Sequence, residues 1–438
     1  MNHEEQPDQP GSDHDRRVLI VGHYASEHSG GEGSIPLRLF GRLRASGVQV
    51  WLLTHVSAQP ELRQLLSAEE YGRVIFAHGI PGFGPLYTLG ERLPPGLRTL
   101  AWAITQIERQ VAMVPVARRL VRELAIDVVH QPISVSPVIP SPMRRLGAPV
   151  VMGPLNGGMA LPPGFADRDS ALNSLVKAVR PAVATLLNAL MRGRPDADVI
   201  FVANDRTRSM LPAAARKRTQ ELSDIGVVLE TLGLPPEAPA SGRAGPVRFL
   251  FVGRLVDWKA VDVLLDAFSL VRKRLPAQLE IVGDGPERAS LVAQAGRLGY
   301  GTDVSFAGWL GPPDCLRRMQ YCDVFVSPSL QEAGGIAILE AMACGRPVVA
   351  AGWGGHLSTV SESAGILVDV TSRAVLVQGL ADAMVELATD PARRATLGAG
   401  GRRLVETRYD WNVIVDQTLR VYRTVAGPAA SPAARLAR

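Results

Sequence analysis

The sequence predicts an α/β protein with two doubly wound parallel sheets, one in each half of a 438-residue chain. The length suits two domains of ordinary size. Short apolar runs alternate with amphipathic helical patterns in both halves, which is typical of βαβ units and a parallel sheet. Residues 233–246, GLPPEAPASGRAGP, are dense in Pro, Gly and Ala, and this composition indicates a linker between the halves.

The expected strands are apolar runs of four to seven residues, most of them bounded by glycine or proline. In the first half they span 17–22, 48–54, 73–77, 127–130, 149–153, 198–203 and 227–230. In the second half they span 247–253, 279–283, 304–308, 323–327, 347–351 and 365–368. Helical patterns separate most of these runs, so we expect parallel strands joined by right-handed crossovers.

These patterns give the expected domain bounds. They are a disordered tail at 1–15, an N-terminal domain at 16–235, a linker at 236–246, a C-terminal domain at 247–405, a C-terminal helix at 406–426 and a second disordered tail at 427–438. The first tail is polar and lacks both a basic start and an apolar stretch, so no signal peptide is visible. Because no run of 18 apolar residues occurs either, we expect a cytoplasmic protein.

The composition argues against a nucleic-acid partner, although the net charge is +5 and the isoelectric point is near 9.3. Only 4 of the 47 basic residues are lysines, and the arginine pairs are scattered without interleaved aromatic residues. Solvated helix faces explain them best, and a weak peripheral contact with anionic lipid on the inner face of the cytoplasmic membrane stays open. The three cysteines form no metal-binding pattern.

The central motif of the chain is 327–351, which reads as a strand end, a glycine loop, a short helix and another strand. Gly334 and Gly335 allow a ligand to approach the backbone closely. A helix is expected over 336–344, ended by Gly345. Its first N–H groups and its dipole provide an anion site.

Two carboxylates bracket this turn. Glu332 precedes the helix that begins at Ile336, and Glu340 lies about 7.5 Å further along the axis at about 1.5 Å per residue. Such spacing suits a sugar nucleotide, with one carboxylate on the sugar hydroxyls, the other on the ribose and the helix start on the diphosphate. The alternative is an ordinary loop with two solvated glutamates.

Two cations are expected at the same sheet edge. Arg254 follows Gly253 at the end of the first strand of the second half, and Lys259 lies at the start of the next helical pattern. Arginine binds diphosphate through its planar fork and lysine as a point charge. A surface pair at a helix start is the alternative, but cations there oppose the helix dipole unless an anion is present.

The first half contributes weaker signals. Gly30 and Gly31 follow the first strand, but Pro36 occupies the third glycine position of a dinucleotide fingerprint, so dinucleotide binding is poorly supported. His130 ends a strand, where open α/β sheets place ligands, although a lone histidine is more often structural. Asn156 lies in another glycine-bearing loop and is a candidate sugar or phosphate contact.

Four segments of the second half carry a family resemblance: 253–268 (GRLVDWKAVDVLLDAF), 281–288 (IVGDGPER), 306–310 (FAGWL) and 332–350 (EAGGIAILEAMACGRPVVA). They resemble the nucleotide-sugar domain of the retaining glycosyltransferases of family 4. The resemblance implies the GT-B fold, with two Rossmann-like domains facing a cleft and the C-terminal helix crossing back to the first, acceptor-side domain. One departure lies at 231–234, where TLGL replaces the N-G-V-D common in such families and leaves the base contacts near Glu230 open.

The resemblance also implies roles for individual residues. Arg254 and Lys259 would bind the donor diphosphate, Glu332 the sugar hydroxyls and Glu340 the ribose. The predicted catalytic residues are His130, Arg254, Lys259 and Glu332; the donor-binding residues are Gly31, Gly253, Arg254, Lys259, Gly334, Gly335, Ile336 and Glu340; the acceptor-side residues are Gly30, His130 and Asn156.

The expected activity is retaining, metal-independent transfer of a hexose from a nucleoside-diphosphate sugar, with UDP favoured over GDP. No cofactor is expected, because the cations and the helix start would stabilise the departing diphosphate. The acceptor is an unidentified glycan, lipid or small molecule, and the family points to bacterial polysaccharide or glycolipid synthesis. An epimerase or hydrolase on the same fold, or a nucleotide-sugar-binding protein without catalysis, are the alternatives.

Overall fold

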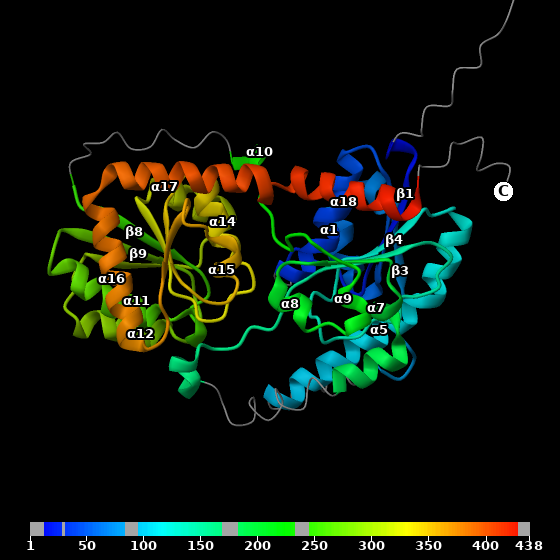
Figure 1. Cartoon of the computed structure of the whole chain (residues 1–438), viewed down its shortest axis with the longest axis horizontal. Helices are drawn as coiled ribbons and strands as arrows, with labels where there is room; N and C mark the ends of the chain where they lie inside the picture. Colours follow the sequence, from blue (N-terminus) through cyan, green and yellow to red (C-terminus); the bar gives the residue numbers. More distant parts are fainter. Residues whose placement is uncertain (1–12, 29–30, 84–94, 169–182, 233–244, 428–438) are drawn as a thin grey trace, which may run out of the picture. The chain divides into compact units, whose positions relative to one another are not determined.

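The chain forms two compact units that each contain one parallel sheet (Figure 1). The structure is a computed structural model and describes residues 13–28, 31–83, 95–168, 183–232 and 245–427. Unit 1 comprises Met1–Gly158, Leu172–Asp224 and Ile414–Arg438, and unit 2 comprises Met159–Ala171 and Ile225–Val413. Residues 236–244 of the linker predicted over 236–246, and most of both predicted tails, lie outside the described residues.

Unit 1 is built on a seven-stranded parallel sheet in the order β3-β2-β1-β4-β5-β6-β7. Its strands are β1 Arg17–Gly22, β2 Gln49–His55, β3 Val74–Ala77, β4 Val128–Gln131, β5 Val150–Leu155, β6 Val199–Val202 and β7 Thr219–Glu221. Its helices include α1 Gly31–Ala45, α2 Gln59–Leu65, α3 Ala68–Tyr71, α5 Pro95–Glu123, α7 Gly193–Asp196, α8 Asp205–Ser209 and α9 Ala213–Arg216. The strand order reverses between β1 and β4, as in a doubly wound sheet.

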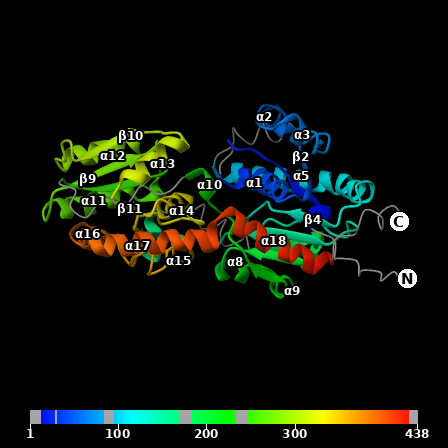
Figure 2. The ribbon, with the colours of Figure 1, turned by 90° about the horizontal axis from the view of Figure 1, so that it is seen from above.

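Unit 2 holds a six-stranded parallel sheet in the order β10-β9-β8-β11-β12-β13. The strands are β8 Val247–Val252, β9 Ala277–Val282, β10 Val304–Gly308, β11 Val324–Ser327, β12 Val348–Ala351 and β13 Gly365–Val368. The helices are α10 Leu229–Leu232, α11 Val261–Arg272, α12 Arg288–Arg297, α13 Pro312–Tyr321, α14 Ile336–Ala343, α15 His356–Thr359, α16 Arg373–Thr389 and α17 Pro391–Leu404. Figure 2 shows α16 and α17 following one another along one side of this unit.

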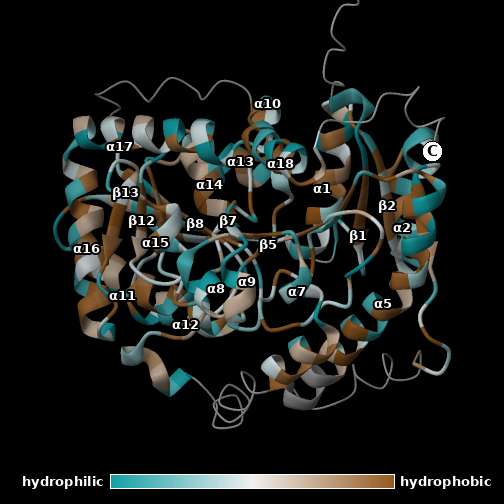
Figure 3. Cartoon of the chain, turned by 45° about the vertical axis from the view of Figure 1, so that its right-hand side comes forward, coloured by the Kyte–Doolittle hydropathy of each residue, from teal (hydrophilic) through white to brown (hydrophobic). Residues whose placement is uncertain are grey.

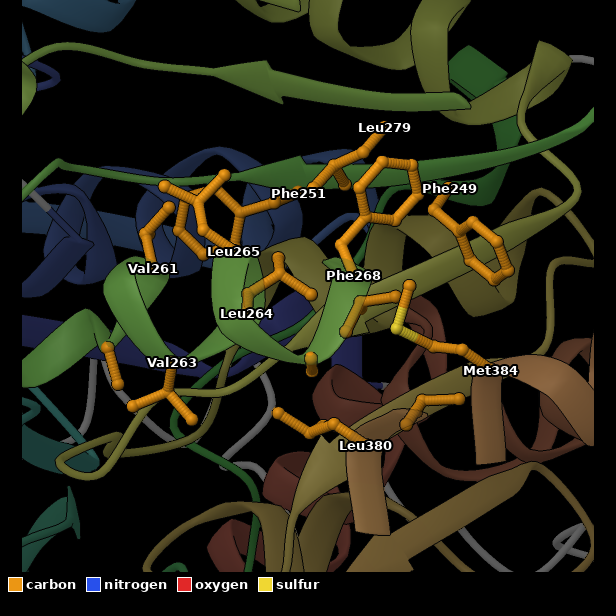
Figure 4. Packing of buried hydrophobic residues seen from close by; sticks show 14 of the residues in the cluster. Phe249, Phe251, Val261, Val263, Leu264, Leu265, Phe268, Leu279, Leu380 and Met384 are labelled. Atoms are coloured by element: carbon orange, nitrogen blue, oxygen red, sulfur yellow. The ribbon is translucent and has the colours of Figure 1, made fainter. Parts of the chain in front are cut away.

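The core of unit 2 explains why its sequence pattern is the cleaner of the two. Phe249 and Phe251 of β8 alternate with Leu250 and therefore face α11, where Phe268 and Leu264 pack against them (Figure 4). Leu250 faces the opposite helix layer of α13 and α14. Strand β12 is apolar along its whole length and β1 is apolar after Arg17, because both faces of each strand are covered (Figure 3).

The C-terminal helix α18 (Trp411–Ala426) belongs to unit 1 from Ile414 onward, which confirms the predicted return to the first domain. The residues before it differ from the prediction of one helix over 406–426, because Val405–Tyr409 form a short π-helical segment that ends before Trp411. The break coincides with a backbone bridge between Val227 and Asp410.

Two other expectations in the first half were wrong. The strand predicted over 227–230 does not close the first sheet, since β7 is its last strand and Leu229–Leu232 is a helical turn. Val227 pairs instead within unit 2: its N–H donates to the carbonyl of Tyr409 at 2.8 Å. Asp13–Asp15, placed in the disordered tail, form a 3-10 turn in which Asp13 pairs with Arg16.

Candidate functional site

The candidate site lies at the point of unit 2 where the strand order reverses. Strands β8 and β11 are neighbours there, and the loops that leave their carboxyl ends carry the predicted cations and Glu332. A pocket of about 310 Å³ opens at this edge. It is lined by Val252, Gly253, Lys259, Trp309, Leu310, Pro312, Cys315, Ser327, Glu332, Gly335, Ile336, Ala337, Ile338 and Glu340.

Lys259 and Glu332 form an ion pair on the wall of this pocket. Lys259 ends the 3-10 turn Asp257–Lys259, and Ala260 then adopts a left-handed conformation with a φ of 51° before α11 begins. Only 20% of the lysine side chain and 17% of the glutamate side chain are exposed. Shielding from solvent strengthens the pair and keeps a cation at a helix start, where the dipole alone would disfavour it.

The start of α14 completes the pocket. Gly335 precedes the helix in the left-handed region, with a φ of 78°, and no side chain caps the first turn. Its first N–H groups have no partner within the helix by the geometry of any α-helix, and Gly335, Ile336 and Ala337 line the pocket. Glu340 lines it one turn further on, as the spacing predicted.

The remaining predicted donor residues divide into two groups. Gly253 lines the pocket, and a side chain there would meet the Phe251 ring at 3.1 Å. Gly334 instead packs against Ile225, whose methyl group lies 2.5 Å from where a Cβ would be placed. The side chain of Arg254 is exposed and does not line the pocket. Lys259 is therefore the cation that the structure brings to Glu332.

His130 does not face open space, contrary to the prediction that it faces the reaction centre. Its side chain is 0% exposed, inside the sheet of unit 1. Nε2–H donates to the Gly153 carbonyl at 2.6 Å, so Nδ1 accepts from the Tyr422 hydroxyl at 2.5 Å. Burial lowers the pKa of His130 to about 4. The residue is a neutral bridge between β4, β5 and α18.

Substituting His130 tests this correction. His130→Gln should lower the free energy of unfolding by about 2–3 kcal/mol, because the glutamine amide has a donor and an acceptor but, on its longer and flexible chain, does not place them where the two imidazole nitrogens stand. The stabilisation by His130 is present above its unfolded pKa near 6.5 and is lost as the pH falls toward its folded pKa of about 4. Glutamine does not titrate, so the difference between the two proteins should shrink by about 2 kcal/mol from pH 7.5 to pH 5. Urea denaturation at both values measures it; a constant difference would contradict the neutral, buried state.

Three further predicted residues belong to unit 1: Gly31, predicted to bind the donor, and Gly30 and Asn156, predicted on the acceptor side. Gly31 begins α1 and has open space where a Cβ would stand, whereas Gly30 lies outside the described residues. Asn156 is 4% exposed, and its Nδ2 donates to Asp224 at 2.9 Å, so it serves a buried network rather than an open surface. Burial raises the pKa of Asp224 to about 6. Glu32 accepts from the Val135 N–H at 3.0 Å and was not predicted.

Several pocket residues were missed by the sequence reasoning. Trp309 and Leu310 follow β10 and line the pocket, with the indole 75% exposed. Both belong to the quoted FAGWL segment, and the exposed aromatic residue in a glycine-bounded turn was the available signal.

His356 donates from Nδ1 to Ala351 at 2.8 Å, so its Nε2 accepts from the Ser327 hydroxyl at 3.3 Å. Burial lowers the pKa of His356, and this neutral ring supports the pocket floor at Ser327.

The described residues contain neither a candidate metal site nor a membrane-spanning helix. No group of three or more His, Cys, Asp or Glu side chains within them is arranged to hold a metal ion. None of the helices in this part of the chain is both long and apolar enough to cross a membrane.

Part of the second half matches the model of a known family. Residues 246–390 match the model described as "Glycosyl transferases group 1", which confirms the resemblance. A Corynebacterium glutamicum GDP-mannose-dependent monoacylated alpha-(1-6)-phosphatidylinositol monomannoside mannosyltransferase is 32% identical over 179 residues, 39% of this chain and 45% of that protein. A Salinispora arenicola D-inositol 3-phosphate glycosyltransferase is 33% identical over 51% of this chain and 49% of its own length. The chain spans about half the length of the curated relatives it matches.

Solved structures extend the likeness to both units. HepE of Anabaena in complex with UDP and glucose superimposes with a TM-score of 0.60 at 20% identity, covering 93% of this chain and 100% of that chain. Sucrose-phosphate synthase from Thermosynechococcus elongatus gives a TM-score of 0.63 at 21% identity, over 93% and 98%. At these identities the likeness shows the fold, which is GT-B as predicted.

Proposed function

We propose that this chain, whose residues 246–390 match the model of the group 1 glycosyl transferases, transfers a hexose from a nucleoside-diphosphate sugar bound in the pocket of unit 2. The observation that carries the proposal is the Lys259–Glu332 pair beside the uncapped start of α14. A cation, free helix N–H groups and a carboxylate in one pocket match the diphosphate and the hydroxyls of such a donor.

The proposed mechanism follows the charges. As the bond between the anomeric carbon and the diphosphate oxygen breaks, negative charge grows on the diphosphate. Lys259 and the first turn of α14 stabilise that charge where it forms, and neither has to reorganise during the reaction. Glu332 accepts from sugar hydroxyls and holds Lys259 in place. The acceptor hydroxyl attacks from the face that the diphosphate leaves, and its proton passes to the departing diphosphate oxygen. The product therefore retains the donor's configuration, and no metal is needed.

The names of the relatives bear on donor and acceptor. The sequence favoured UDP over GDP, but the Corynebacterium relative is named for GDP-mannose, as is a Mycolicibacterium smegmatis relative that is 33% identical over 51% of this chain. We therefore place GDP-mannose first among the donors to test. Their acceptors are phosphatidylinositol glycolipids, which supports a glycolipid acceptor and a peripheral contact with the membrane for this chain.

A donor screen tests the proposed function. The thermal midpoint is measured with GDP-mannose and with UDP-, ADP- and dTDP-sugars. A true donor stabilises the folded chain by about 2.7 kcal/mol at 100 times its Kd and stands out from the other nucleotides. Donors that bind are then incubated with lipid extract, and release of nucleoside diphosphate is followed. Release of free sugar without acceptor would select a hydrolase, and binding by none of the donors would refute the proposal.

A further inference from the structure

Residues 159–168 leave unit 1 directly after β5 and belong to unit 2. The indole N–H of Trp353 donates to the Ala160 carbonyl at 2.7 Å. Phe165 is 2% exposed within the core of unit 2, and Gly164 lies so close to Thr371 that a Cβ would stand 2.2 Å from its carbonyl oxygen. The segment is therefore anchored to the unit that carries the donor pocket.

Arg168 ends this segment at the turn that carries Lys259. One guanidinium nitrogen, Nη1, donates to the carbonyl of Asp257 at 2.7 Å and lies 2.9 Å from the Asp257 carboxylate. The other, Nη2, binds Asp262 at 2.7 Å, and the guanidinium stacks over Phe165 at 5.5 Å. Only 13% of the side chain is exposed, so these contacts are largely shielded from water. Because the planar guanidinium of Arg168 binds both Asp257 and Asp262, it fixes the turn more firmly than a single point charge would.

The same turn is held from its other side. The carbonyl of Trp258 accepts from the N–H of Leu330 at 2.8 Å, which ties the turn to the loop that leads to Glu332. The Asp257 carbonyl also accepts from the Ala260 N–H at 3.0 Å, and this bond closes the turn. Arg168 therefore binds the backbone just before Trp258, and Leu330 binds it just after, so both contacts fix the turn next to Lys259.

We propose that Arg168 is a positioning residue for donor binding: it fixes the turn Asp257–Lys259 so that the Lys259 ammonium meets both Glu332 and the donor diphosphate. The inference rests on the proposed function, because it assigns the diphosphate to Lys259. Arg168 itself does not line the pocket and acts only through the turn. Removing it frees the turn, and the ammonium is then no longer pre-placed.

Arg373 provides a matched control. It binds Asp262 as Arg168 does and also reaches Asp266 at 2.6 Å, but both carboxylates belong to α11 and neither to the turn Asp257–Lys259. Loss of either arginine therefore removes an ion pair with Asp262, whereas only Arg168→Met also removes the contacts with the turn Asp257–Lys259. A purely structural role would make the two variants behave alike.

The test is calorimetric titration of GDP and of UDP into the full chain. We expect Arg168→Met to weaken the tighter of the two nucleotides about tenfold, the equivalent of one charge-assisted hydrogen bond. Arg373→Met should bind within twofold of the wild type. In a Lys259→Met background, Arg168→Met should cause no further loss, because both changes remove the same interaction.

Three results would overturn the inference. These are wild-type affinity in Arg168→Met, an equal loss in Arg373→Met, or an additive loss in the double variant. If the wild type binds neither GDP nor UDP nor any of the nucleotide sugars in the donor screen, the proposed function itself fails and the inference falls with it. Wild-type binding without an effect of Arg168 refutes the inference alone, so the two failures are distinguishable.

Discussion

Replacing Lys259 with alanine is expected to lower the rate of sugar transfer about 10²- to 10³-fold. The ammonium is the cation that the structure holds on the pocket wall against Glu332, and its removal takes positive charge from the place where the diphosphate charge develops. Because the charge interacts more strongly with the transition state than with the bound donor, kcat should fall more than the donor KM rises. Release of nucleoside diphosphate under saturating donor measures the effect.

Lys273→Ala is the matched control. Lys273 is exposed at the end of α11 in the same unit, outside the residues that line the pocket. Its loss changes the net charge by the same amount and should leave the rate within about twofold. A Lys259→Ala protein that is folded by circular dichroism and transfers sugar at the rate of the Lys273→Ala protein would show that Lys259 has no part in the chemistry.

Replacing Glu332 with alanine should reduce kcat/KM for the donor about 10²-fold, with a different binding signature. The carboxylate contacts Lys259 and, in the proposal, the sugar hydroxyls. Affinity for the intact nucleotide sugar should therefore fall more than affinity for the free nucleoside diphosphate. Titration of both ligands into the variant gives the two ratios.

Glu362→Ala serves as the control for this variant, since Glu362 is exposed on the loop after α15. It should bind both ligands as the wild type does. If Glu332→Ala loses affinity for the free diphosphate and for the nucleotide sugar by the same factor, Glu332 acts only by holding Lys259, and its assignment to the sugar is wrong.

The donor side of the molecule could be predicted from the sequence because its determinants are local. Apolar runs and glycines set the strands β8 and β11, and the topology of a parallel sheet brings the ends of neighbouring strands together. Lys259 and Glu332 lie 73 residues apart in the chain, yet each is fixed by the strand it follows. Glu332 and Glu340 both line the pocket, as predicted, because α14 has a known rise per residue and places Glu340 about one turn beyond its start.

The first half was harder because its site residues depend on distant partners. His130 lies near the end of a strand, at the edge where ligands bind. However, the hydroxyl of Tyr422, which lies in α18 and 292 residues later in the chain, donates a hydrogen bond to its Nδ1. Arg168 lies 89 residues before Asp257, in a stretch without clear periodicity, and its position follows from Phe165 entering the core of unit 2. Arg254 shows the remaining limit, because position in a loop does not determine which way an exposed side chain turns.

Hydrogen–deuterium exchange with and without the donor tests most directly whether the pocket of unit 2 holds the nucleotide sugar. Backbone amides in 253–259 and 332–340 should exchange more slowly once the donor found in the screen is bound, because these two segments carry the lysine turn and the start of α14. Amides of α16, which contributes no residue to the pocket lining, serve as the internal reference. Protection confined to other parts of the chain, with both segments unchanged at saturating donor, would contradict the assignment of the site.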